Sequence, residues 1–120
     1  MALHPAGQAP NTDISFTINT SNIYENGSGS DMQVYKDNHI GVLKVTAKIK
    51  SSISSGNNLA IGTVDKIPAT AFYGTAFNAD NSNVCGRFGL SGSNGGLAFV
   101  ATTNIQAGST VFGEVVFYIN

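Results

Sequence analysis

Charged side chains are scarce in this sequence. Only 13 of its 120 residues are Lys, Arg, Asp or Glu, and the formal net charge is −1. Nucleic-acid-binding proteins need clustered Lys and Arg to neutralise phosphates, so the composition argues against a nucleic-acid partner. Low charge combined with 42% hydrophobic residues also argues against disorder, which requires few apolar groups and a high net charge.

Cysteine and histidine are nearly absent. The one cysteine, Cys85, cannot form an internal disulfide, and its apolar neighbourhood predicts a buried free thiol in a chain folded in a reducing cytosol. The two histidines, His4 and His39, do not have the spacing of a metal-binding pair, and there is no Cys-x-x-Cys. We therefore expect neither a metal nor a cofactor.

Long apolar runs are missing as well. None approaches the ~18 residues of a membrane span, so we expect no membrane insertion. The first residues also lack the basic and apolar regions of a signal peptide.

Turn-forming residues are abundant instead. Gly, Asn, Ser and Thr together supply 49 residues, a density typical of short strands separated by turns. Residues 1–12 contain two prolines and no periodic pattern, which indicates a flexible tail or linker. The remaining chain, residues 13–120, has the length of a single domain with a core of its own.

Alternation of apolar and polar side chains predicts the strands. The clearest case is residues 43–50, where every second side chain is apolar over eight positions. Hairpin turns are expected at residues 37–39 and at Asn94-Gly95. The other expected strands are residues 14–19, 32–36, 59–64, 71–78, 84–90, 97–102 and 111–119.

About eight short strands at this spacing predict an all-β domain. We expect an antiparallel two-sheet sandwich, jelly-roll-like in its connections. The inward phase of the strands gives the expected core: Leu43, Val45, Ala47, Ile49, Phe88, Phe99 and Phe117.

The last strand is apolar on both faces. Phe112 and Tyr118 lie on the phase opposite to Val111, Val115 and Phe117. One face of a monomeric sheet normally meets water, so this pattern indicates an oligomer interface or a sheet covered by the N-terminal tail. Tyr73, Phe112, Val116 and Tyr118 are the expected interface residues.

No motif indicates an enzyme. There is no Gly-x-Ser-x-Gly nucleophile elbow and no phosphate-binding loop, and the seven carboxylates are scattered. Lys44, Lys48 and Lys50 share one strand face, which is more typical of a solvated outer surface than of a binding patch.

The order of features from residue 41 onward points to a family. An alternating strand (GVLKVTAKIKSS) is followed by SGNNLAIGTV, by an Ile-Pro segment leading into an aromatic strand (DKIPATAFYGTAF), by a glycine-centred hairpin (GRFGLSGSNGGLAFVA) and by AGSTVFGEVVFYIN. This arrangement resembles the C-terminal head domains of receptor-binding and tail-fibre or baseplate proteins from phages of Gram-positive bacteria. The resemblance covers about two-thirds of the chain.

The resemblance implies a homotrimer of jelly-roll heads at the tip of a virion tail, made in the host cytoplasm. Such heads contact other tail or baseplate proteins and recognise a host cell-wall saccharide. Polar loops rich in Asn, Ser and Asp suit this task, because sugars are held by hydrogen bonds above an aromatic ring.

The loop sequence suggests where a saccharide binds. We expect Asp80, Asn81 and Asn83 of one turn to act together with Arg87, the only arginine, whose planar guanidinium can bind two hydroxyls. Tyr73 or His39 is expected to supply the ring. The alternative is a plain turn in which Arg87 pairs with an acidic neighbour, and residues 54–58 are then the next candidate loop.

Three other functions stay open. The chain can be a purely structural β-sandwich subunit of a baseplate, capsid or appendage without glycan binding. It can be a trimeric jelly-roll signalling ligand, although the missing signal peptide counts against export. A small lyase or hydrolase, with a carboxylate pair formed across the fold, is the enzymatic alternative.

Overall fold

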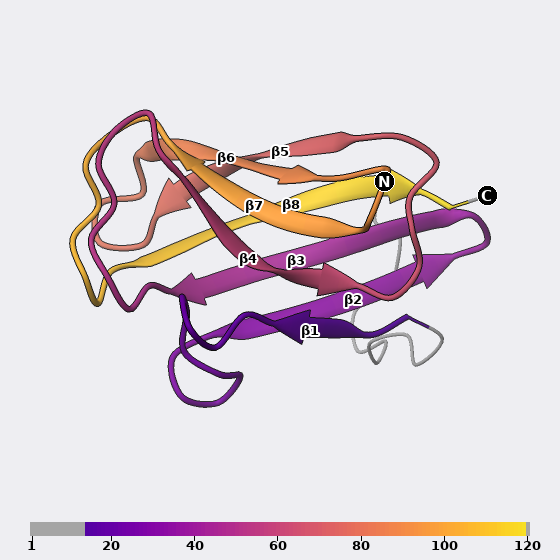
Figure 1. Ribbon diagram of the computed structural model, residues 1–120, viewed down its shortest axis with the longest axis horizontal. Coiled ribbons are helices and arrows are strands. Elements are labelled where there is room, and N and C mark those ends of the chain that lie inside the picture. Colours follow the sequence, from indigo (N-terminus) through magenta and orange to yellow (C-terminus); the bar gives the residue numbers. More distant parts are fainter. Residues whose placement is uncertain (1–13, 120) are drawn as a thin grey trace.

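Eight antiparallel strands make up the fold (Figure 1). The structure is a computed structural model that describes residues 14–119, apart from the side chain of Asp37. The predicted tail at residues 1–12 lies outside the described residues. The strands are β1 (Phe16–Ile18), β2 (Asp31–Asp37), β3 (Ile40–Lys48), β4 (Asn58–Val64), β5 (Phe72–Asn78), β6 (Val84–Leu90), β7 (Gly96–Ala101) and β8 (Thr110–Tyr118).

The sequence predicted these strands closely, because alternation and turn chemistry are local signals. The β2–β3 hairpin turns at Asn38, which has a φ of 55°, and the β6–β7 hairpin turns at Gly95, with a φ of 73°. Positive φ is tolerated by Asn and Gly, the residue types found at these two turns. Both predicted hairpins are confirmed.

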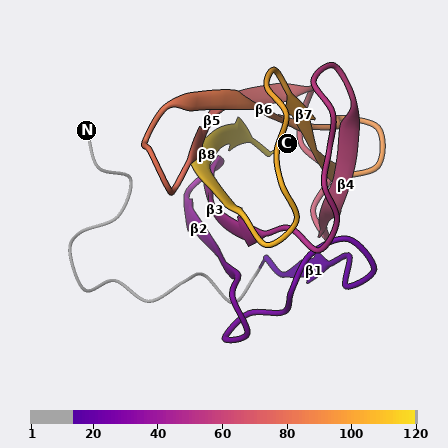
Figure 2. The same ribbon diagram turned by 90° about the vertical axis from the view of Figure 1, so that its left-hand side faces the viewer.

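The strands form one continuous hydrogen-bonded order, β1-β4-β7-β6-β5-β8-β3-β2. The sheet curls until its edge strands β1 and β2 approach each other, so it is nearly closed and barrel-like (Figure 2). The all-β, antiparallel prediction is confirmed, whereas the division into two separate sheets is not. The chain after β1 helps to close the sheet, because the backbone N–H of Tyr24 donates to the carbonyl of Lys48 at 3.0 Å.

The core lies inside the curled sheet. All seven residues predicted to be core are at most 2% exposed. Two β-bulges correct the phase where simple alternation fails. One of them, between Ala76 and Phe77 of β5, lets both Cys85 and Gly86 face inward while Val84 is exposed.

Residues 14–119 contain no helix of the length and apolar character needed to cross a membrane.

Truncation of Phe117 tests the core. Its ring is fully buried and lies directly against Gly41, where no side chain intervenes. We expect Phe117→Ala to lower the free energy of unfolding by about 3–5 kcal/mol, because the lost contacts leave a cavity. Val84→Ala is the control, since Val84 on β6 is an exposed aliphatic side chain, 55% exposed. Denaturant unfolding of both variants gives the comparison, and equal losses would contradict this core assignment.

Candidate functional site

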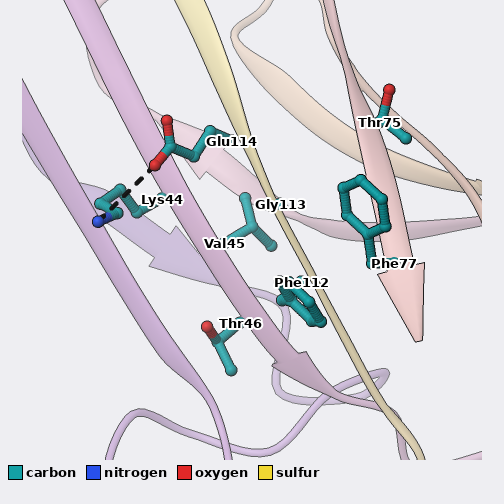
Figure 3. Close-up of a pocket in the computed structure, with 8 residues that line it drawn as sticks. All are labelled: Lys44, Val45, Thr46, Thr75, Phe77, Phe112, Gly113 and Glu114. Atoms are coloured by element: carbon teal, nitrogen blue, oxygen red, sulfur yellow. Dashed lines mark ion pairs between the residues drawn. The ribbon is translucent and has the colours of Figure 1, made fainter. Parts of the chain in front are cut away.

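A groove of about 620 Å³ lies on the outer face of the sheet, across the three neighbouring strands β5, β8 and β3 (Figure 3). Most of its side chains belong to the outward phase of these strands. The groove is lined by Lys44, Val45, Thr46, Thr75, Phe77, Phe112, Gly113 and Glu114.

Two phenylalanines form the floor of the groove. Phe77 of β5 and Phe112 of β8 are direct cross-strand partners, and their rings are stacked with centroids 5.5 Å apart and an interplanar angle of 29°. Both side chains are half-buried. A cross-strand aromatic pair stabilises the sheet and leaves apolar ring surface facing solvent.

Polar side chains stand beside this floor. Glu114 of β8 and Lys44 of β3 are cross-strand partners, with Lys44 Nζ 3.7 Å from Glu114 Oε1. Thr46, the β3 partner of Phe112, supplies one hydroxyl, and Thr75 of β5 supplies another from the opposite side (Figure 3). The groove therefore combines an aromatic surface with charged and uncharged hydrogen-bonding groups.

Two glycines allow β5 and β8 to cross closely enough to form the groove. The strands pair only through residues 76–78 of β5 and 111–113 of β8. A Cβ atom at Gly113 would overlap the carbonyl oxygen of Thr75, and one at Gly74 would overlap the carbonyl oxygen of Glu114. Any larger residue at either position would push the two strands apart.

Tyr73 and Arg87 were both predicted to be site residues, and the structure brings them together. The guanidinium carbon of Arg87 lies 5.2 Å from the centre of the Tyr73 ring, a cation–π contact between β6 and β5. Both side chains are exposed. Among the described residues Arg87 forms no ion pair.

Asp80, Asn81 and Asn83 form a tight turn between β5 and β6. The backbone N–H of Asp80 donates to Asn78 Oδ1, and that of Asn83 donates to Asn81 Oδ1, each at 2.9 Å. The side-chain oxygen of Asn81 is therefore already used within the turn. Asn81 and Asn83 also line a second cleft, of about 340 Å³, with Thr103 and Asn104 of the β7–β8 connection.

The six predicted site residues do not form one site. Arg87 is the cross-strand partner of Thr75 in the middle of β5 and β6, whereas the turn at residues 79–83 lies at the end of these two strands. His39 lies at the opposite end, since Ile40 pairs with Tyr118 while Asn78 pairs with Val111 at the other end of β8 (Figure 1).

The loop at residues 54–58, the second sequence candidate, lies at the same end as the turn at residues 79–83. It is tied to the β7–β8 connection, because the backbone N–H of Ser55 donates to Asn104 Oδ1 at 2.9 Å and its hydroxyl donates to the Thr102 carbonyl at 3.0 Å. The connections β3–β4, β5–β6 and β7–β8 therefore lie together at one end of the domain (Figure 1).

Sequence reasoning missed the groove itself. It interpreted the face of Lys44 as a solvated surface and assigned Phe112 to an oligomer interface. In the structure Phe112 packs on Phe77 of the same chain. The available signal was the outward phase of both phenylalanines, but only the pairing of β5 with β8 makes them neighbours.

Metal-binding clusters are absent from residues 14–119, apart from the undescribed side chain of Asp37: no three His, Cys, Asp or Glu side chains gather closely enough to hold an ion. Comparison of the sequence with protein-family models and with curated proteins finds no match.

Cys85 lies beside the 340 Å³ cleft but is only 2% exposed. Desolvation by burial raises the pKa of its thiol above the ordinary value, against a smaller lowering by a backbone hydrogen bond. Only the thiolate attacks an alkylating reagent, so both burial and the raised pKa slow the reaction. We expect alkylation at mildly alkaline pH to be much slower in the native protein than in denaturant, as followed by mass spectrometry. Equal rates would show an accessible thiol.

Proposed function

We propose that this domain is the saccharide-binding head of a phage tail receptor-binding protein, and that host cell-surface glycan occupies the groove on β5, β8 and β3. The observation that carries the binding site is the stacked pair Phe77 and Phe112 flanked by Lys44 and Glu114. The phage origin rests on the resemblance of residues 41–120 to the heads of such proteins.

Sugar chemistry suits this combination of side chains. The C–H faces of a pyranose ring are apolar and pack on an aromatic ring, while its hydroxyls both donate and accept hydrogen bonds. The groove offers an aromatic floor, two threonine hydroxyls, one ammonium and one carboxylate. A groove open to water admits one segment of a longer chain.

A jelly roll is the finer description of the fold that we propose. The pairs β3–β8, β4–β7 and β5–β6 are nested, as in one long hairpin, and the pairs β5–β8 and β6–β7 arise when that hairpin is rolled up. On this description β2-β3-β8-β5 and β6-β7-β4-β1 are the two halves of a sandwich, joined through β5 and β6.

A homotrimer located at the virion tail tip completes the proposal. Tyr73, Val116 and Tyr118 are 62%, 46% and 54% exposed, which is unusual for large apolar side chains on neighbouring strands. We propose that copies of the chain meet over these residues, and that other tail or baseplate proteins hold the trimer.

A glycan array tests the binding function. We expect the purified protein to bind at least one bacterial cell-surface polysaccharide, and Phe112→Ala to weaken that binding about tenfold through loss of the stacking surface. Tyr24→Ala is the aromatic control, because Tyr24 lies outside the groove and stacks with Lys48 and Lys50 instead. Thermal unfolding of each variant confirms that it remains folded.

The loop residues provide the competing site. Arg87→Ala and Asp80→Ala are expected to reduce polysaccharide binding less than Phe112→Ala does. If they abolish binding and Phe112→Ala does not, the site lies at the Tyr73–Arg87 pair or the adjoining turn. If no polysaccharide binds while the protein still assembles, the structural subunit without glycan binding becomes the better description.

Light scattering tests the homotrimer. We expect three copies at micromolar concentration, and Val116→Asp to shift the protein toward monomer because a carboxylate would be buried between copies without a partner. Thr63→Asp on β4 is the matched control, since Thr63 is exposed on another strand. A monomeric parent protein would contradict the proposed interface.

A further inference from the structure

The Lys44–Glu114 pair is the only ion pair among the described residues, and it lies within the groove. Its N–O distance of 3.7 Å exceeds that of a strong charge-assisted hydrogen bond. Both side chains are about half-exposed, at 45% and 54%. An exposed pair of this kind contributes little to stability, so a ligand can exchange its own hydrogen bonds for the ion pair at small cost.

The two groups have opposite and complementary hydrogen-bonding capacities. The ammonium of Lys44 only donates, and the carboxylate of Glu114 only accepts. Among the described side chains, neither Lys44 nor Glu114 forms a hydrogen bond beyond this ion pair. The side chain of Gln33, the β2 partner of Lys44, already donates to Asp31. Beyond the ion pair, a group of donors and a group of acceptors therefore lie side by side next to the aromatic floor, available to a ligand.

Two neighbouring ring hydroxyls of a sugar match this arrangement. Their oxygen atoms are separated by about the length of one hydrogen bond, and each hydroxyl can both donate and accept. One hydroxyl can donate to Glu114 while its neighbour accepts from Lys44. A sugar with a single hydroxyl at this place would leave one charged group without a ligand partner.

The charges also select against acidic sugars. Lys44 and Glu114 cancel within the groove. The next charged side chains along the strands are Arg87 beside Thr75, Asp31 beside Thr46, and Lys48 two residues after Thr46 on β3. A carboxylate or phosphate seated on Lys44 would face Glu114 at close range. We propose that the groove is specific for a neutral saccharide unit whose two adjacent free hydroxyls bridge Glu114 and Lys44. This inference rests on the proposed saccharide binding.

The experiment begins with the bound polysaccharides of the array. The bound polymers are expected to be neutral and to carry adjacent free hydroxyls, with binding nearly independent of salt concentration. The bound sugar type is then supplied as its methyl glycoside, together with the set of methyl glycosides that each lack one ring hydroxyl. We expect only two of these derivatives to compete more weakly than the complete methyl glycoside, by about tenfold, and we expect their missing hydroxyls to be at adjacent ring positions. Each of the two loses a hydrogen bond to a charged group of the protein.

Variants assign each hydroxyl to its protein partner. Glu114→Gln and Lys44→Met are each expected to weaken binding several-fold. Removal of the hydroxyl that binds Glu114 should weaken binding less in Glu114→Gln than in the parent protein, because the variant already lacks that hydrogen bond. Removal of the adjacent hydroxyl should likewise weaken binding less in Lys44→Met. The double variant K44E/E114K is expected to retain most binding, because either hydroxyl can donate or accept.

The outcomes separate this inference from the proposed function. Suppose that Phe112→Ala loses binding but that the bound polymers are acidic, or that removal of a hydroxyl weakens competition at only one ring position or at two non-adjacent positions. The diol inference is then overturned, while saccharide binding in the groove stands. The diol inference is also overturned if Glu114→Gln and Lys44→Met bind like the parent protein. If no polysaccharide binds, the proposed function and this inference fail together.

Discussion

The antiparallel pairing of β8 with β3 is the constraint on which the rest of the structure depends. Nine consecutive residues of β8 pair with nine of β3 in unbroken register. Because side chains alternate, this register sends Val111, Val115 and Phe117 into the core and Phe112 and Glu114 to the outer face. A slip of one residue would exchange the two sets and destroy core and groove together.

The core and the proposed binding groove lie on opposite faces of the same strands. The inner face is closely packed, and its large side chains are inaccessible to water. The outer groove consists of half-exposed side chains, and its ion pair adds little to the free energy of folding. Chemical groups on the outer face can therefore be arranged for a ligand without loss of the core. Gly74 and Gly113 are the exception, since the groove requires the strands to cross where only glycine fits.

Parts of the candidate surface were predictable because they depend on local hairpins. Tyr73 and Arg87 lie on β5 and β6, which are consecutive strands joined by a short turn. Both residues were predicted from the sequence as candidate site residues. His39 lies at the end of the domain opposite to the turn at residues 79–83, and this placement follows from the direction of β3 in the sheet. Phe77 and Phe112 are 35 positions apart in the sequence, and neither one shows by itself that the other is its neighbour.

The sequence by itself determined where the strands lie, where they turn and which side chains face inward, down to the burial of Phe88, Phe99 and Phe117. These features follow from alternation and from turn residues, which act over a few neighbouring positions. Only the tertiary structure decided that β8 lies between β3 and β5, that the sheet is continuous, and that Lys44 meets Glu114. Backbone hydrogen bonds between strands are the same for every side chain, so the order of strands depends on the packing of the whole chain.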